Sequence, residues 1–246
     1  MRNIINVRNL FVLLAALMLA AACADRKPQG GENGAPGTAS ALPGDSMVYG
    51  MACEGCTDSI LVFLSEEGGD PDTIDILRAT LARRVLGRPR IGDNLAVAFN
   101  PDNRQEALCV VNIDRLKGTW AYQVVPTLRR RAVDSAMKDS LPPIPDSIMR
   151  KIMVPREYGF TLKRNHAAQP LISGTRDARR NRQSLVQYPR PRFYTEWHLF
   201  NGKLILTQES RDSSKESISD TAEILSLRRD TLLLRFAGET KAYYRK

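Results

Sequence analysis

The stretch YTEWHLFNGKLIL, residues 194–206, decides the fold. Asn201-Gly202 stands near its centre, between two runs in which apolar residues recur. The two-residue turn of a tight β-hairpin requires positive φ at both positions, and Asn followed by Gly adopts this conformation readily. The sequence therefore predicts two antiparallel strands that meet at this turn.

Similar strand patterns lie on both sides of the hairpin, at residues 158–163, 169–173, 217–227, 231–236 and 240–245. Breaks at Arg229-Asp230 and Gly238-Glu239 predict two more hairpins. These five strands, the two strands of the hairpin and a strand around Trp120 make eight. Eight strands close an up-and-down antiparallel barrel with room for side chains or one small ligand. The fold class is therefore mostly β, and residues 117–246 are predicted to form this barrel.

The start of the predicted barrel carries a known motif. Gly118-Thr119-Trp120 is similar to the Gly-x-Trp opening of lipocalins, and residues 194–206 and 220–243 resemble the lipocalin-like domain of Gram-negative bacterial lipoproteins. The resemblance implies a cup-shaped barrel, in a family with no settled ligand. The chain departs from the pattern in a short helical insertion within residues 128–153 and in a long basic loop before Phe193.

Five aromatic residues of this half are candidates for lining a ligand cavity: Trp120, Phe160, Tyr194, Trp197 and Tyr243. All of them except Tyr194 are the favoured ligand-binding residues. Aromatic side chains in strands are also common core residues. Two interpretations therefore stay open, a barrel with an open cavity and a barrel that its own side chains fill.

A smaller β domain is predicted for residues 46–116. Strand-like runs occur at residues 47–51, 59–64, 94–99 and 107–113, and turn-forming residues separate them. The pattern does not determine how these strands are ordered in a sheet.

Cys53-Glu54-Gly55-Cys56 lies in this domain and has several interpretations. A thioredoxin-type site needs a helix after the motif, but residues 60–64 have a strand pattern. A zinc site needs two more ligands, and both histidines lie in the other half, so no metal site is expected. The segment is also similar to the Cys-x-x-Cys segment of copper-stress outer-membrane lipoproteins. A structural disulfide between Cys53 and Cys56 is favoured, with metal binding or redox sensing as the alternatives.

The last of the four cysteines, Cys109, stands in an apolar strand pattern. It is expected to be a buried free thiol.

The N-terminus has the pattern of a cleaved export signal. Arg2 and Arg8 precede an apolar run of about a dozen residues, too short to span a membrane, which takes roughly 20. The run ends at Ala20-Ala21-Ala22-Cys23, which resembles a lipobox and predicts a signal peptide at residues 1–22 with lipidation of Cys23. Ordinary cleavage after Ala24 is the alternative. Residues 23–45 are rich in Gly, Pro, Ser and Ala and are expected to form a flexible tether.

The chain carries a formal net charge of +9 at pH 7. An exported protein meets anionic lipid headgroups rather than nucleic acid, so no nucleic-acid partner is expected. An arginine run in the loop before Phe193 forms either a solvated face or a contact with an anionic surface or an envelope protein. The run consists of Arg176, Arg179, Arg180, Arg182, Arg190 and Arg192, and the first four are the expected contact residues.

Motifs of catalysis are missing from the sequence. It contains no Gly-x-Ser-x-Gly elbow, no Walker loop, no Gly-x-Gly-x-x-Gly fingerprint and no His-Glu-x-x-His motif. We therefore expect a non-enzymatic protein without a cofactor, held in the cell envelope by a lipid anchor, with the outer membrane as the expected location. The favoured function is binding of a small apolar or amphipathic ligand in the barrel. The alternatives are an envelope scaffold and envelope stress sensing through Cys53 and Cys56.

Overall fold

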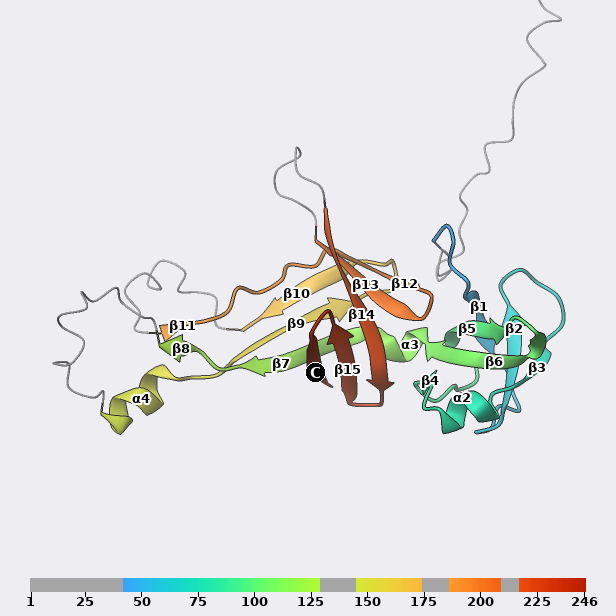
Figure 1. Ribbon diagram of the computed structural model, residues 1–246, viewed down its shortest axis with the longest axis horizontal. Helices are drawn as coiled ribbons and strands as arrows, with labels where there is room; N and C mark the ends of the chain where they lie inside the picture. Colours follow the sequence, from blue (N-terminus) through green and yellow to red (C-terminus); the bar gives the residue numbers. More distant parts are fainter. Residues whose placement is uncertain (1–41, 129–144, 174–185, 209–216) are drawn as a thin grey trace, which may run out of the picture. The chain divides into compact units, whose positions relative to one another are not determined.

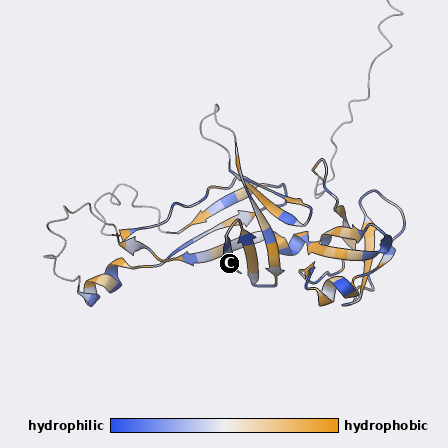
Figure 2. Cartoon of the chain, in the orientation of Figure 1, coloured by the Kyte–Doolittle hydropathy of each residue, from blue (hydrophilic) through white to orange (hydrophobic). Residues whose placement is uncertain are grey.

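Two β-sheets, each built from its own stretch of sequence, make up most of the described chain (Figure 1). The structure is a computed structural model, and it describes residues 42–128, 145–173, 186–208 and 217–246. Hydrophobic and hydrophilic residues alternate along many strands (Figure 2). Because successive side chains of a strand point to opposite faces, this pattern gives each sheet one apolar face.

The first sheet contains β1 (Val48–Ala52), β2 (Ile60–Ser65), β3 (Asp72–Asp75), β4 (Val85–Leu86), β5 (Asn94–Asn100) and β6 (Asn103–Asn112). β1 pairs antiparallel with β2 and β5, β2 pairs with β3, and β5 pairs with β6. A parallel contact between Asp75 of β3 and Glu106 of β6 closes these five strands into a barrel, and β4 runs parallel to β6. The short helix α2 (Leu77–Leu81) follows β3. This Greek-key closure is the topology of OB-fold barrels.

The four strands predicted for this sheet are confirmed as β1, β2, β5 and β6. β3 and β4 have no recognisable sequence pattern. Only Ile74 is buried in β3, and β4 has two residues. β3 pairs with its neighbour β2 along its length and with β6 at Asp75, and β4 pairs with β6, from which β5 separates it in the sequence.

The second sheet begins after helix α3 (Ile113–Leu116). It contains β7 (Gly118–Val124), β9 (Arg156–Leu162), β10 (Ala168–Ile172), β12 (Glu196–Phe200), β13 (Lys203–Gln208), β14 (Ile218–Leu227), β15 (Thr231–Phe236) and β16 (Glu239–Arg245). The strand order is β10-β9-β7-β16-β15-β14-β13-β12, and every pairing is antiparallel. The two edge strands approach each other at a bridge between Ala167 and Glu196. The eight-stranded barrel predicted from the sequence is therefore confirmed as a nearly closed barrel.

The hairpin that joins β12 and β13 has the predicted turn. Asn201 and Gly202 both have positive φ, at 50° and 73°. Trp197 pairs with Leu206 and Leu199 pairs with Leu204, and all four side chains are buried. The Asn-Gly turn thus sets the register that sends one face of this hairpin into the barrel core.

The described part of the predicted helical insertion holds one short helix, α4 (Asp146–Ile152). A two-stranded pairing of β8 (Thr127–Leu128) with β11 (Val186–Gln187) also occurs near the insertion and was not predicted. Both strands have two residues, too few for a sequence pattern.

The first and last strands of the larger barrel are joined by Arg245. Its guanidinium carbon lies 4.4 Å from the ring centre of Trp120. The guanidinium donates hydrogen bonds to the carbonyl oxygens of Lys117 at 3.0 Å, of Arg229 at 2.9 Å, and of Arg115. Gly118 has a φ of 127°, and a Cβ at this position would collide with the guanidinium. The Gly-x-Trp motif therefore leaves room for the arginine and supplies the ring on which it stacks.

Replacing Arg245 should destabilise the larger barrel. In Arg245→Gln the three carbonyl oxygens lose a charged donor, and each such bond contributes about 1.5–3 kcal/mol, so we expect a loss of about 3 kcal/mol or more in the free energy of unfolding. Urea denaturation measures this loss. The control is Arg235→Gln, which breaks an exposed ion pair with Glu223 on the same sheet and should cost at most about 1 kcal/mol. Equal losses in the two variants would contradict the role of Arg245.

Both histidines of the sequence meet where the two edge strands approach. The rings of His166 and His198 stack with their centres 4.6 Å apart and their planes at 14°. Nε2 of His166 and Nδ1 of His198 are buried and have no hydrogen-bond partner among the described residues. Burial, then the neighbouring His166, lowers the pKa of His198 below its usual value, and Glu196 opposes this shift. His198 is therefore neutral at pH 7.

This lowered pKa predicts a loss of stability in mild acid. Below pH 6.5, the ordinary pKa of histidine, the unfolded chain takes up a proton that folded His198 resists. The free energy of unfolding should therefore fall between pH 7.5 and pH 5, and it should fall less in His198→Gln. Denaturation at a series of pH values tests this. Identical pH profiles for the parent and the variant would contradict it.

Candidate functional site in the barrel mouth

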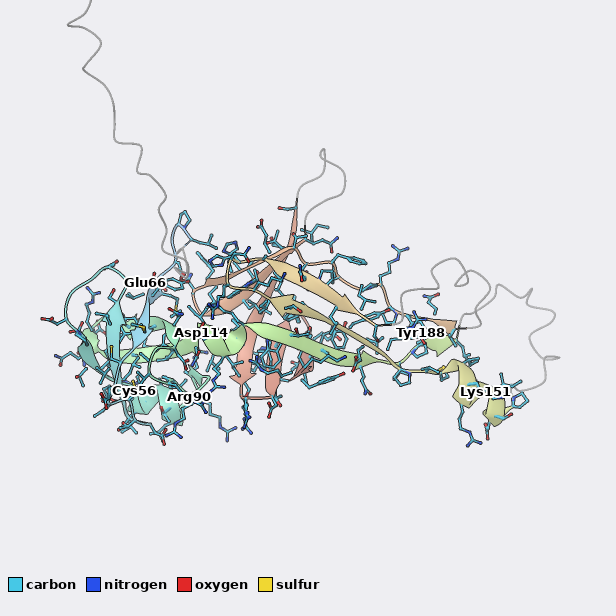
Figure 3. The ribbon with its side chains drawn as sticks, turned by 180° about the vertical axis from the view of Figure 1, so that it is seen from behind. Cys56, Glu66, Arg90, Asp114, Lys151 and Tyr188 are labelled. Carbon is cyan, nitrogen blue, oxygen red and sulfur yellow. The ribbon has the colours of Figure 1, made fainter. Side chains whose placement is uncertain are left out.

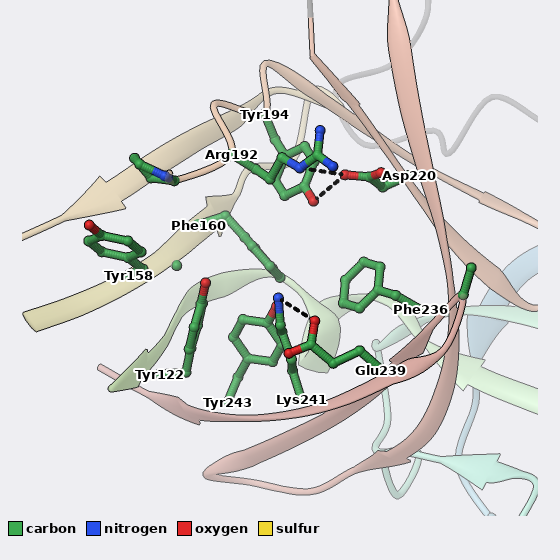
Figure 4. Close-up of a pocket in the computed structure, with 13 residues that line it drawn as sticks. Tyr122, Tyr158, Phe160, Arg192, Tyr194, Asp220, Phe236, Glu239, Lys241 and Tyr243 are labelled. Carbon is green, nitrogen blue, oxygen red and sulfur yellow. Dashed lines mark hydrogen bonds and ion pairs between the residues drawn. The ribbon is translucent and has the colours of Figure 1, made fainter. Parts of the chain in front are cut away.

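The larger barrel contains a cavity of about 320 Å³ (Figure 4). Thirteen residues line it, and we call this set the mouth: Tyr122, Tyr158, Gly159, Phe160, Pro191, Arg192, Tyr194, Asp220, Phe236, Ala237, Glu239, Lys241 and Tyr243. They come from β7, β9, β14, β15 and β16 and from the segments that precede β12 and β16. The volume is at the lower end of the range for small-molecule sites.

The alternation of β16 determines which of its residues reach the cavity. Glu239, Lys241, Tyr243 and Arg245 share one face of the strand because they are two residues apart. The first three line the mouth, and the fourth contacts Trp120. β16 thus connects the open end of the barrel with the end that Trp120 fills.

Aromatic rings form a continuous wall of the mouth. Tyr122 contacts Tyr158 and Tyr243 edge-on, with ring centres 6.3 and 5.2 Å apart. Phe160 contacts Tyr243 at 5.1 Å and Tyr194 at 6.0 Å. Each ring is held by its neighbours, so the wall offers a preformed apolar surface to a ligand.

Two pairs of opposite charge also line the mouth. The hydroxyl of Tyr194 donates to Asp220 at 2.7 Å, and Nε of Arg192 lies 3.6 Å from the same carboxylate oxygen. Across the cavity, Nζ of Lys241 lies 3.1 Å from Glu239 (Figure 4). The mouth is therefore amphipathic, and its formal charges balance.

The tyrosine hydroxyls of the mouth stay protonated at neutral pH. Burial is the largest cause that raises the pKa of Tyr122, of Tyr158, of Tyr194 and of Tyr243 above the usual value. The carboxylate of Asp220 adds to the rise at Tyr194 through its hydrogen bond. The four hydroxyls therefore do not act as phenolates. Those of Tyr158 and Tyr194 donate within the protein, to the carbonyl oxygen of Pro189 and to Asp220, which leaves those of Tyr122 and Tyr243 to donate to a ligand.

A family model described as lipocalin-like matches residues 193–246. The match contains β12 to β16 and seven of the residues that line the mouth. It supports a lipocalin-like domain, as the resemblance of residues 194–206 and 220–243 implied, and Gly118-Thr119-Trp120 lies outside the match. No curated protein and no solved structure matches the chain.

The lipocalin-like barrel divides the four predicted ligand residues into two groups. Phe160 and Tyr243 line the mouth. Trp120 and Trp197 are 0% and 1% exposed and are not among the lining residues. Their ring nitrogens donate to the carbonyl oxygens of Leu116 at 2.7 Å and Lys163 at 2.9 Å. The two tryptophans thus fill the core of the barrel.

The sequence analysis missed Tyr122 and Lys241 as residues of the mouth. Strand periodicity could have found them, because each lies two residues from an aromatic residue that had been singled out, Trp120 or Tyr243. Arg192 and Asp220 had no such signal, since their approach to Tyr194 depends on the closure of the barrel.

Cys53 and Cys56 lie in the connection between β1 and β2 and are free cysteines in the structure. Cys56 is labelled in Figure 3. The sulfur of Cys56 lies 3.2 Å from the carbonyl oxygen of Cys53 and 3.6 Å from that of Val62. The motif is followed by strand β2, in agreement with the sequence analysis, so it has no redox helix. The disulfide and the copper-related alternatives stay predictions.

Cys109 is a buried free cysteine of β6, and burial raises the pKa of its thiol. This placement agrees with the predicted buried thiol. A buried, protonated thiol is a poor nucleophile and a poor metal ligand.

Several predicted sites lie outside the described residues: Cys23, Arg176, Arg179, Arg180 and Arg182. Within the described ranges, no group of three or more His, Cys, Asp or Glu side chains could hold a metal ion. A search of the same ranges finds no helix with the length and apolar character needed to cross a membrane.

Proposed function

We propose that the protein binds a small amphipathic molecule in the mouth of its lipocalin-like barrel. The observation that carries this proposal is the cavity of about 320 Å³ with its wall of aromatic rings. The rings offer apolar surface, and the charged groups and hydroxyls beside them suit a polar end of the ligand. The proposed role is binding rather than catalysis.

The proposal predicts that the full chain, purified without denaturation, retains a small molecule in native mass spectrometry. Tyr122→Ala removes one ring from the wall of the mouth and should lower the retained fraction or the affinity by about tenfold, because an aromatic contact contributes about 1 kcal/mol or more. Tyr188→Ala is the matched control, since Tyr188 is half-buried and does not line the mouth. A protein free of any ligand, or equal retention in both variants, would contradict the proposal.

We also propose that the chain is exported and anchored to a membrane of the cell envelope through a lipid on Cys23. The basic start, the short apolar run and the small residues before Cys23 support this. Cells grown with a clickable palmitate analogue should label the parent chain, and Cys23→Ser should abolish the label and release the protein from the membrane fraction. Cys109→Ser is the control that should keep both. Labelling that persists in Cys23→Ser would contradict lipidation at Cys23.

A further inference from the structure

The mouth has hydrogen-bond donors that no described residue engages. The carboxylates of Asp220 and Glu239 are each engaged by a neighbouring cation. The hydroxyls of Tyr122 and Tyr243 have no hydrogen-bond partner among the described residues. The ammonium of Lys241 has three N–H donors, and the carboxylate that pairs with it among the described residues is that of Glu239. A ligand group that accepts several hydrogen bonds is therefore matched here better than one that donates them.

The position that a ligand cation would prefer is already filled. Nζ of Lys241 lies 5.4 Å from the ring centre of Tyr122 and 5.8 Å from that of Phe236. Ring faces at this distance attract a cation, and here the protein supplies one itself. An ammonium ligand would have to displace Lys241, whereas a carboxylate ligand would gain it as a partner.

The pair of Lys241 and Glu239 can rearrange at low cost. The two residues are on the same strand next to the β15–β16 turn, and the side chain of Glu239 is 64% exposed. An ion pair with this exposure contributes at most about 1 kcal/mol, because water screens it. A ligand carboxylate inside the mouth can therefore take the place of Glu239 beside Lys241.

We infer that the mouth binds an amphiphile by its carboxylate, with Lys241 and the hydroxyls of Tyr122 and Tyr243 as the donors and Glu239 as an internal competitor for Lys241. The aromatic wall takes the apolar part of the ligand. This inference rests on the proposed function and adds the chemical class of the ligand. It also predicts that replacing Glu239 raises the affinity for the ligand, whereas replacing Lys241, Tyr122 or Tyr243 lowers it.

Three probes with the same ten-carbon chain test the inference: decanoate, decylammonium and 1-decanol. Calorimetric titration of the full chain should show tighter binding of decanoate than of the other two. Glu239→Gln should raise the affinity for decanoate by roughly threefold, which corresponds to the loss of an exposed ion pair. Lys241→Met should lower it by about tenfold, the effect of losing one charge-assisted hydrogen bond, and should leave 1-decanol unchanged.

Glu223→Gln is the control variant. Glu223 belongs to β14, pairs with Arg235 and does not line the mouth, so its loss should leave all three affinities unchanged. The carboxylate inference would be overturned, while the binding function stands, by any of three results. These are equal affinity for the three probes, tighter binding of decylammonium, or a decanoate affinity that is the same in both mouth variants as in the parent chain. Failure of all three probes to bind the parent chain would overturn both proposals.

Discussion

The contact of Arg245 with Trp120 is the constraint on which the larger barrel depends. Its guanidinium stacks on the ring and reaches backbone carbonyls of α3, of the start of β7 and of the β14–β15 turn. An eight-stranded barrel must bring its chain ends together, and here one side chain of the last strand holds the first. Gly118 is required by the same contact, because any Cβ there would occupy the space of the guanidinium.

Filling this end with Trp120 and Trp197 determines where the barrel can be open. Both rings are fully buried, and each satisfies its nitrogen by a backbone carbonyl. On β7, Tyr122 lies two residues after Trp120 on the same inward face. On β16, Tyr243 and Lys241 lie two and four residues before Arg245, on the face that contacts Trp120. The residues that stabilise the fold and those that can bind a ligand are therefore successive members of the same strand faces.

Local sequence patterns predicted the larger barrel because short turns join β12 to β13, β14 to β15 and β15 to β16. Asn201-Gly202 specifies a hairpin without help from distant residues, and its dihedral angles confirm it. The closure of the smaller barrel could not be predicted in this way, since it depends on one parallel contact between Asp75 and Glu106. Aromatic periodicity identified Phe160 and Tyr243. It could not separate them from Trp120 and Trp197, because whether an inward ring fills the core or faces a cavity depends on its height in the barrel.

The seven tyrosines of the sequence allow the most direct test of ligand binding in the mouth. Carbon-13 labelled tyrosine rings can be followed by NMR while decanoate is added to the full chain, with Tyr→Phe variants to assign the signals. The account predicts that the signals of Tyr122, Tyr158, Tyr194 and Tyr243, which line the mouth, shift with decanoate. Those of Tyr49, Tyr188 and Tyr244 should stay in place. Unchanged signals from all seven rings at high decanoate concentration, or shifts confined to the second group, would contradict it.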